Sequence, residues 1–216
     1  MFFIDRRDAG KKLAEKLSVY RGEKIFVMAI PRGGVPIGYE ISRRLQVPLD
    51  LIVPRKLPIP WSPEAGFGAV APDGTVVLNE ELLAGLGLTD REISDIAEEV
   101  LGEVRRRLRT YRGDRPFPDL SGKTVIVVDD GLASGYTMIA AVRALKKQDP
   151  KKVIVAVPVS PASAVKKLSQ EADEVITLHT QPFGPFAVAS FYESFPDLTD
   201  EEVMDLINES LSMARS

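Results

Sequence analysis

The 216-residue sequence contains no cysteine, little net charge and no long apolar run. Without cysteine there is neither a disulfide framework nor thiolate chemistry. A net charge of -3 gives no general attraction to nucleic acid or to membranes. No apolar run is long enough to span a bilayer, and residues 1–7 lack the layout of a signal peptide. We therefore expect a cytoplasmic protein without a membrane or nucleic-acid partner.

One stretch, residues 125–138, combines a strand, two acids and a glycine-containing turn. Val125–Val128 is an unbroken β-branched run, as expected for a strand buried on both faces. Asp129 and Asp130 follow where the strand should leave the core, and carboxylates suit ribose hydroxyls or Mg²⁺. The turn that comes next leads directly into a helix, whose first amides can hold a phosphate dianion. The turn residues are Gly131, Leu132, Ala133, Ser134, Gly135, Tyr136 and Thr137.

Rival motifs that contain an acidic pair fit this sequence less well. A Walker B strand also ends in acids, but the chain has no G-x-x-x-x-G-K-[ST] loop. A response-regulator receiver has an acidic pair without a phosphate loop directly behind it. The alternative to a binding site is a purely structural role, in which the two acids only cap the start of the following helix.

A second candidate anion site follows an earlier apolar strand. After the run 24–30 come Arg32, Gly33 and Gly34, which lead into a helix ending near Leu45. A cation beside a tight glycine turn at a strand end favours an anion site, although the same tripeptide also occurs in plain turns.

Residues 54–75 contain several prolines and glycines, which argue against regular structure. We expect a long flexible loop here, with Arg55 and Lys56 at its base able to reach an anion. The alternative is a proline-stiffened surface loop with two solvated charges. Trp61 is expected to pack beneath the loop.

The remaining pattern alternates strands and helices, which predicts an α/β fold with a doubly wound, mostly parallel sheet. Ligands of such sheets bind outside the carboxyl ends of the strands. Ser160 and Pro161 are expected to start a helix, and a last core strand is expected over 174–178 with His179 just beyond it.

These motifs together resemble the type I phosphoribosyltransferases, in which such a loop holds the 5-phosphate of phosphoribosyl pyrophosphate (PRPP). The opening Phe3–Arg6 with Ala9 and Gly10, and the Arg55–Lys56 loop with Pro63 and Glu64, are similar to a group of these proteins whose substrate is unassigned. The resemblance covers nearly the whole chain and implies one phosphoribosyltransferase domain over 1–216. It also implies Mg²⁺ as cofactor and a homodimer.

In that resemblance Asp129 and Asp130 contact the ribose, and contact Mg²⁺ largely through PRPP and water. The pyrophosphate would be held by Arg32, Gly33, Gly34, Arg55 and Lys56. Catalysis is assigned to Asp129, Asp130, Arg32 and Lys56.

The base-binding side of the resemblance is less specific. Residues 179–196 with the C-terminal helix look like the hood over the base, with Phe186 where purine-specific members place a stacking aromatic; packing of Phe186 in the core is the alternative. Ala133 stands where hypoxanthine-type members carry an acid, which makes Glu64 the acid/base candidate, as in adenine-type members.

The resemblance implies transfer of the phosphoribosyl group of PRPP to a nitrogenous base with release of pyrophosphate. The acceptor base stays open. Two other hypotheses remain: a non-catalytic regulatory protein that binds PRPP on the same fold, and an unrelated enzyme that uses the loop for a different phosphate.

Overall fold

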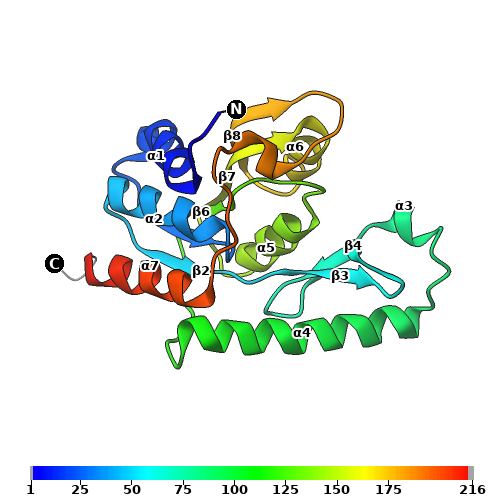
Figure 1. Ribbon diagram of the computed structural model, residues 1–216. Coiled ribbons are helices and arrows are strands. Elements are labelled where there is room, and N and C mark those ends of the chain that lie inside the picture. The colour runs from blue at the N-terminus through cyan, green and yellow to red at the C-terminus, as the bar shows by residue number, and fades with distance from the viewer. Residues whose placement is uncertain (1, 214–216) are drawn as a thin grey trace.

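A five-stranded parallel sheet forms the centre of the molecule (Figure 1). The computed structural model describes residues 2–213. Every neighbouring pair of strands in this sheet is parallel, as the alternating sequence pattern predicts. In spatial order the strands are β2 (Leu49–Leu51), β1 (Ile25–Ala29), β6 (Thr124–Val128), β7 (Lys152–Pro161) and β8 (Glu174–Gln181).

The sheet is buried on both faces. Along β6, Ile126 and Val128 belong to one apolar cluster, whereas Val125 and Val127 belong to the other. All four side chains are fully buried. Successive side chains of a strand point to opposite faces, so the unbroken apolar run supplies both halves of the core.

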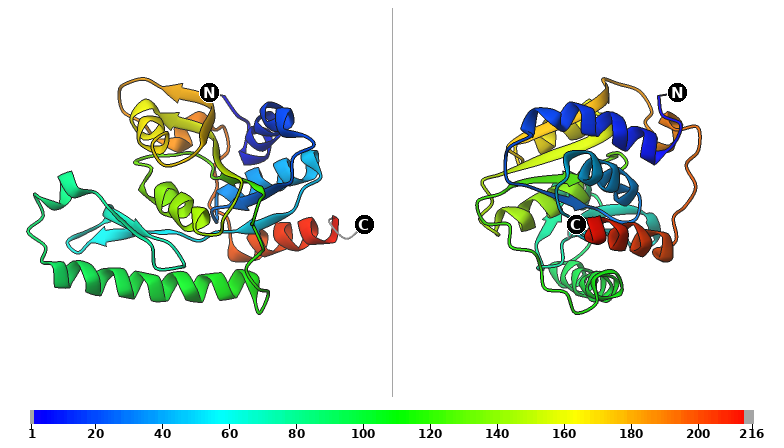
Figure 2. Two further views of the ribbon diagram at one scale, coloured as in Figure 1. Left: turned by 180° about the vertical axis from the view of Figure 1, so that it is seen from behind. Right: turned by 90° about the vertical axis from the view of Figure 1, so that its left-hand side faces the viewer.

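Helices cover the two faces of the sheet (Figures 1 and 2). One face carries α1 (Arg6–Lys16, followed by the 3-10 turn Leu17–Tyr20), α2 (Gly34–Leu45) and α7 (Asp200–Met213). The other carries α5 (Tyr136–Lys146) and α6 (Ala162–Leu168). Helices on both sides confirm the doubly wound architecture, and they place the β6–α5 turn at the carboxyl edge of the sheet.

The segment expected to be an irregular loop is instead a small antiparallel sheet. Its strands are β3 (Arg55–Ile59), β4 (Ser62–Val70) and β5 (Val76–Leu78). Pro58 is accommodated because the β3–β4 register shifts on both sides of it, and a bulge tolerates a residue without an N–H. Trp61 lies in the turn between β3 and β4 and is 63% exposed, so the expectation that it packs beneath the segment is wrong.

A long helix supports this hairpin. α4 (Asp90–Arg112) has Thr89 as its N-cap, in a capping box with Glu92, and buries Val100 and Val104. The short helix α3 (Glu80–Leu83) precedes it. Hairpin and α4 project side by side from the central sheet (Figures 1 and 2), and an ion pair of 2.9 Å joins Arg55 to Glu103. Among residues 2–213 no helix is both long and apolar enough to cross a bilayer.

Two predicted element boundaries near the last strands are wrong. Ser160 and Pro161 end β7 rather than starting a helix, and α6 begins at Ala162 without a side-chain cap. His179 lies inside β8, where it pairs with Val159, instead of following the strand. Both differences arise because β7 and β8 continue pairing beyond the apolar core, a tertiary preference that overrides local cap signals.

Candidate active site

The turn after β6 forms a polar pocket at the carboxyl edge of the sheet. The pocket has a volume of about 300 Å³, and we call it the loop pocket. Gly135, which precedes α5, has φ of 86°, a conformation that favours glycine. The first amides of α5 have no partner within the helix and favour a bound anion. The loop pocket is lined by Gly131, Leu132, Ala133, Ser134, Gly135, Tyr136 and Thr137, together with Lys56, Glu64, Gly66 and Gly68.

Glycine is required at the start of this turn. A Cβ on Gly131 would lie 2.6 Å from a methyl carbon of Val188 and 2.9 Å from one of Val159. The turn is further fixed by the amide of Leu132, which donates to the carbonyl of Val159 at 3.0 Å. The loop is therefore packed tightly against β7 and the 3-10 turn Val188–Phe191.

Asp129 and Asp130, which directly follow β6, have different surroundings. Burial raises the pKa of Asp129 well above its ordinary value, and the adjacent Asp130 carboxylate raises that pKa further. Asp129 Oδ1 accepts the amide N–H of Asp130 at 2.8 Å. Burial also raises the pKa of Asp130, against the opposing effect of a nearby guanidinium. A pair of adjacent carboxyl groups whose pKa values are raised by burial is typical of a functional site.

That guanidinium belongs to Arg6, which the sequence patterns did not assign to the site. Arg6 Nε donates to Asp130 Oδ2 at 2.8 Å, and the two side chains are only 9% and 16% exposed. Arg6 Nη1 donates to the carbonyl of Pro196 at 2.7 Å, and the guanidinium lies 3.7 Å from the centroid of the Phe195 ring. Tyr192 donates its hydroxyl proton to the carbonyl of Asp130 at 2.6 Å. Asp130 is thus bound by Arg6 from the first turn of α1 and by Tyr192 from the segment before α7.

One signal in the sequence points to Arg6. It occupies the first position of α1, where the helix dipole disfavours a cation. An arginine at that position is best explained by a nearby carboxylate.

The Arg-Gly-Gly turn predicted as an anion site lies directly beside the acids. A Cβ on Gly33 would lie 2.0 Å from Asp130 Oδ2, and one on Gly34 would lie 2.7 Å from the carbonyl oxygen of Val128. The peptide bond between Pro31 and Arg32 is cis. These glycines let the turn after β1 approach the carboxyl end of β6, so the two candidate anion sites adjoin.

The cations predicted for this region do not all converge. Lys56 lines the loop pocket and donates to the backbone carbonyl of Glu64, which lines it too. Arg55 points instead to Glu103 on α4. Arg32 lies outside the loop-pocket lining and faces Asp200, with 3.5 Å between Nη1 and Oδ1.

Asp200 is itself held by α4. Tyr111 donates its hydroxyl proton to Asp200 Oδ1 at 2.5 Å, and Arg107 lies 3.8 Å from the same oxygen. These contacts lower the pKa of Asp200, chiefly through the Tyr111 hydrogen bond. Asp200 thus receives contacts from Arg32, Arg107 and Tyr111.

The aromatic residues of the 179–196 segment pack mainly on one another. Phe186 lies 5.2 Å from the Phe191 ring, and Phe2 stacks on His179 at 4.6 Å and on Phe191 at 5.5 Å between centroids. Phe186 does not line the loop pocket. Phe186 is partly buried and packs against the apolar cluster that contains Phe191.

Comparison with known proteins places this site in a family. A family model described as the phosphoribosyl transferase domain matches residues 71–190, which is more than half of the 216 residues. The chain belongs to the phosphoribosyl transferase domain family. The matched range contains the acidic pair and the whole loop-pocket turn, so the resemblance seen in these motifs is confirmed.

Similar proteins extend the match over nearly the whole chain. In Mycobacterium tuberculosis H37Rv the protein named Putative phosphoribosyl transferase Rv0571c is 38% identical over 206 residues, which is 95% of this chain but 46% of that protein. A uracil phosphoribosyltransferase of Staphylococcus haemolyticus is 26% identical over 173 residues, covering 76% of this chain and 79% of that protein. The chain spans about half the length of the first of these phosphoribosyl transferase relatives.

One solved structure has the same fold along its full length. The crystal structure of TT1426 from Thermus thermophilus has a TM-score of 0.80 and 37% identity, and the match covers 97% of this chain and 99% of that one.

Proposed function

We propose that this protein transfers the 5-phosphoribosyl group of PRPP to a nitrogenous base and releases pyrophosphate. The observation that supports this proposal most strongly is the position of the carboxyl groups of Asp129 and Asp130, which lie between the loop pocket and the Arg-Gly-Gly turn. A phosphate, a ribose and a diphosphate follow one another in PRPP in the same order. Membership of the phosphoribosyl transferase family supports the same reaction class.

In the proposed reaction a nitrogen of the base forms a bond to C1 of the ribose while the bond from C1 to the pyrophosphate oxygen breaks. The loop-pocket amides and the hydroxyls of Ser134 and Thr137 hold the 5-phosphate. The hydroxyls of the ribose lie against Asp129 and Asp130, whose negative charge stabilises the cationic sugar ring of the transition state. The proton lost by the base goes to Glu64 or to solvent.

Lys56 and Arg32 are proposed to stabilise the negative charge that grows on the leaving pyrophosphate. Lys56 already lines the loop pocket, whereas Arg32 first exchanges Asp200 for the diphosphate. Loss of one such preorganised charged contact typically lowers the rate by about a hundredfold to a thousandfold.

Two adjacent carboxylates fit a Mg²⁺ ion that is held largely by PRPP oxygens and water, since Mg²⁺ usually takes few protein ligands. Within residues 2–213 no cluster of three or more histidine or acidic side chains could enclose a metal by itself. When bound, Mg²⁺ would neutralise charge on the diphosphate.

A screen for pyrophosphate release tests the proposal. The protein is incubated with PRPP, Mg²⁺ and, in turn, purines, pyrimidines and pyridine carboxylates, and the nucleotide product is identified by mass spectrometry. Turnover with one base class supports transfer and names the acceptor.

Calorimetry decides between transfer and the second candidate function, a PRPP-binding regulatory protein. PRPP binding without pyrophosphate release in the presence of any base would favour the regulator. The structural observation that supports a regulator is that Arg32 and Arg55 form ion pairs away from the loop pocket. Ribose 5-phosphate binding as tightly as PRPP would contradict both.

A further inference from the structure

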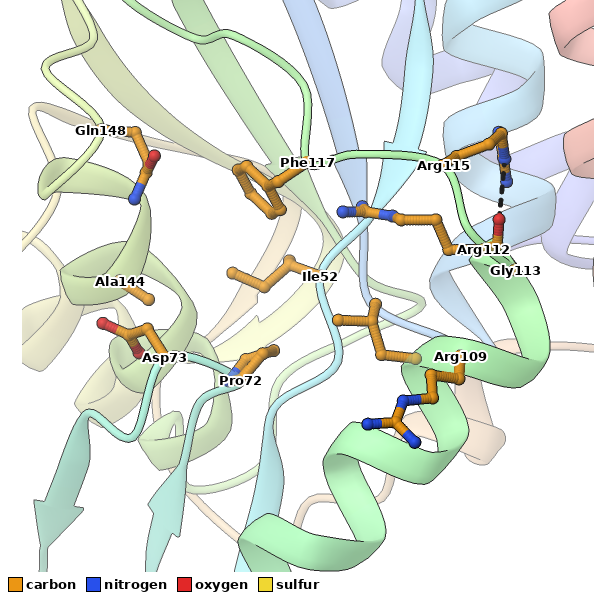
Figure 3. A pocket seen from close by; sticks show the side chains of 11 residues that line it. Ile52, Pro72, Asp73, Arg109, Arg112, Gly113, Arg115, Phe117, Ala144 and Gln148 are labelled. Atoms are coloured by element: carbon orange, nitrogen blue, oxygen red, sulfur yellow. Dashed lines mark hydrogen bonds between the residues drawn. The ribbon is translucent and has the colours of Figure 1, made fainter.

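A second cavity lies between the end of α4, the end of α5 and the segments that flank the β3–β4 hairpin. It has a volume of about 410 Å³, within the range of small-molecule sites, and we call it the hinge cavity (Figure 3). Much of its wall is apolar. That part is formed by Ile52, Pro72, Leu108, Phe117 and Ala144.

The ring of Phe117 gives the hinge cavity an aromatic wall. Phe117 is 39% exposed, although its ring lies 4.8 Å from the Arg112 guanidinium. In Figure 3 the side chains of Phe117, Ile52 and Pro72 lie in a row, with Ile52 between the other two. A flat apolar group can therefore pack against this row of apolar side chains.

Three arginines also line the cavity. Arg109 and Arg115 line the hinge cavity with Arg112, and the one carboxylate among them, Asp73, is already bound by Lys147 at 2.8 Å. Arg115 uses its guanidinium on the backbone carbonyls of Arg112 and Tyr111. No ion pair within residues 2–213 neutralises Arg109 or Arg115, so the cavity carries positive charge.

Arg112 contributes a buried donor without a partner. Its side chain is 5% exposed, and Nη2 is engaged by Asp50 at 3.0 Å and by the Leu51 carbonyl at 2.9 Å. Its Nε has no hydrogen-bond partner among the described residues. Buried guanidinium protons are rarely left unpaired, so Arg112 holds an unsatisfied donor, shielded from solvent, behind this wall of the cavity.

The end of α4 and the segment after it form much of the hinge cavity, and two further elements connect this cavity to the loop pocket. α5 lines the loop pocket with Tyr136 at its start and the hinge cavity with Ala144 near its end. The β3–β4 hairpin does the same, because Lys56 lines the loop pocket while Ile52 and Pro72, which flank the hairpin, line the hinge cavity. A molecule in one cavity thus contacts elements that shape the other.

We propose that the hinge cavity is a second ligand site, which takes a small organic anion carrying a flat apolar ring and adjusts the hairpin position. The ring packs on Phe117 and Ile52, and the anionic group is paired by Arg109 at the mouth. Its binding does not depend on the proposed transfer reaction.

Calorimetry on the full chain tests this site with two anions, 1-naphthoate as an aromatic carboxylate and 1-naphthalenesulfonate as an aromatic sulfonate. We expect at least one to bind with a one-to-one ratio. Arg109→Glu should weaken that binding at least about tenfold, because it reverses a charge at a charge-assisted contact. The matched control Arg105→Glu, an exposed arginine one turn earlier and outside the lining, should leave it unchanged.

The uncharged analogue 1-naphthalenemethanol should bind at least about tenfold more weakly than 1-naphthoate if charge is required. If Arg109→Glu leaves the affinities for both anions unchanged, or if neither anion binds, the proposal is overturned. Loss of PRPP turnover has no bearing on this result, so the two proposals fail separately.

Trp61 reports on the hairpin. It is the single tryptophan, and it is 63% exposed at the β3–β4 turn. Ligand saturation should change its emission in the wild-type protein and in Arg105→Glu at the same ligand concentration, with the midpoint shifted in Arg109→Glu. Emission that stays constant while the ligand binds would overturn the proposed link to the hairpin.

Discussion

Arg6 and Asp130 are 124 positions apart in the sequence, and their side chains form a 2.8 Å ion pair in which both partners are largely buried. The contact connects the first turn of α1 to the acid that ends the central strand. Phe195 and the carbonyl of Pro196 complete the surroundings of the guanidinium. The position of Asp130 is consequently set by the two ends of the chain as well as by the sheet.

Arg6→Met should lower both stability and PRPP affinity. Removing one partner of a buried ion pair leaves the other charge uncompensated, which costs about 3 kcal/mol of unfolding free energy near pH 8. The pKa of Asp130 should then rise further, so that the loss becomes smaller as the pH falls and the carboxyl takes up a proton. Denaturant unfolding at several pH values measures this.

The adjacent Arg7→Met is the control for that variant. Arg7 is 49% exposed, and its partner Glu40 keeps an ion pair to Arg43 at 2.8 Å. We expect a cost of at most about 1 kcal/mol. Equal losses for the two variants would show that Arg6 has no special role at Asp130.

Asp129→Asn should raise the unfolding free energy of the unliganded protein at pH 8 while it removes PRPP binding. The folded-state pKa of Asp129 lies above its unfolded value, so its favourable contribution is fully present only below the unfolded pKa and is lost as pH rises through the folded pKa. The asparagine avoids this loss, because it stays neutral and still accepts the amide of Asp130.

The advantage of Asp129→Asn should shrink as the pH approaches the ordinary carboxyl range, and thermal unfolding between pH 4 and pH 8 follows it. Asp95→Asn, at an aspartate that is 70% exposed, supplies the control and should change the unfolding free energy at pH 8 only slightly. A variant that is less stable than wild type at pH 8 would contradict the assignment of a raised pKa to Asp129.

Lys56→Met should reduce the rate of pyrophosphate release by about a hundredfold or more, because Lys56 lines the loop pocket and is proposed to stabilise the leaving group. Its neighbour Arg55 faces Glu103 instead, so Arg55→Met should change the rate much less. Steady-state kinetics of the two variants compares these rates. A larger loss of rate in Arg55→Met than in Lys56→Met would indicate that the hairpin exchanges its two faces before PRPP binds.

Gly131→Ala should destabilise the fold by about 1–3 kcal/mol, the usual cost of inserting a methyl group into a packed region. The new Cβ would lie 2.6 Å from Val188 Cγ1. The double variant Gly131→Ala with Val188→Ala removes that methyl and should recover part of the loss. Additive losses in denaturant unfolding would show that the clash with Val188 is not the cause.

The central sheet and the site turn were predictable from sequence because their signals are local. The β-branched run 125–128, the acidic pair and the glycine turn stand together in the chain, and the Thr89 capping box fixes the start of α4. The hairpin was missed because its prolines and glycines argue against strands, whereas the bulge at Pro58 that accommodates them is a property of strand pairing.

The long-range contacts that orient the charged side chains of the site were not predictable from the sequence. Arg6 reaches Asp130, and Arg32 reaches Asp200, across large separations in sequence. Arg55 and Lys56 are neighbours that point to different partners, because successive residues of a strand face opposite sides. Sequence patterns give residue types and faces, whereas the pairing depends on how the packed elements meet.

The most direct test is a crystal structure of the protein with PRPP and Mg²⁺. Our account predicts the 5-phosphate in the turn Gly131–Thr137, the ribose hydroxyls against Asp129 and Asp130, and the diphosphate beside Gly33. A turn without phosphate, with PRPP bound at another place on the protein, would contradict it.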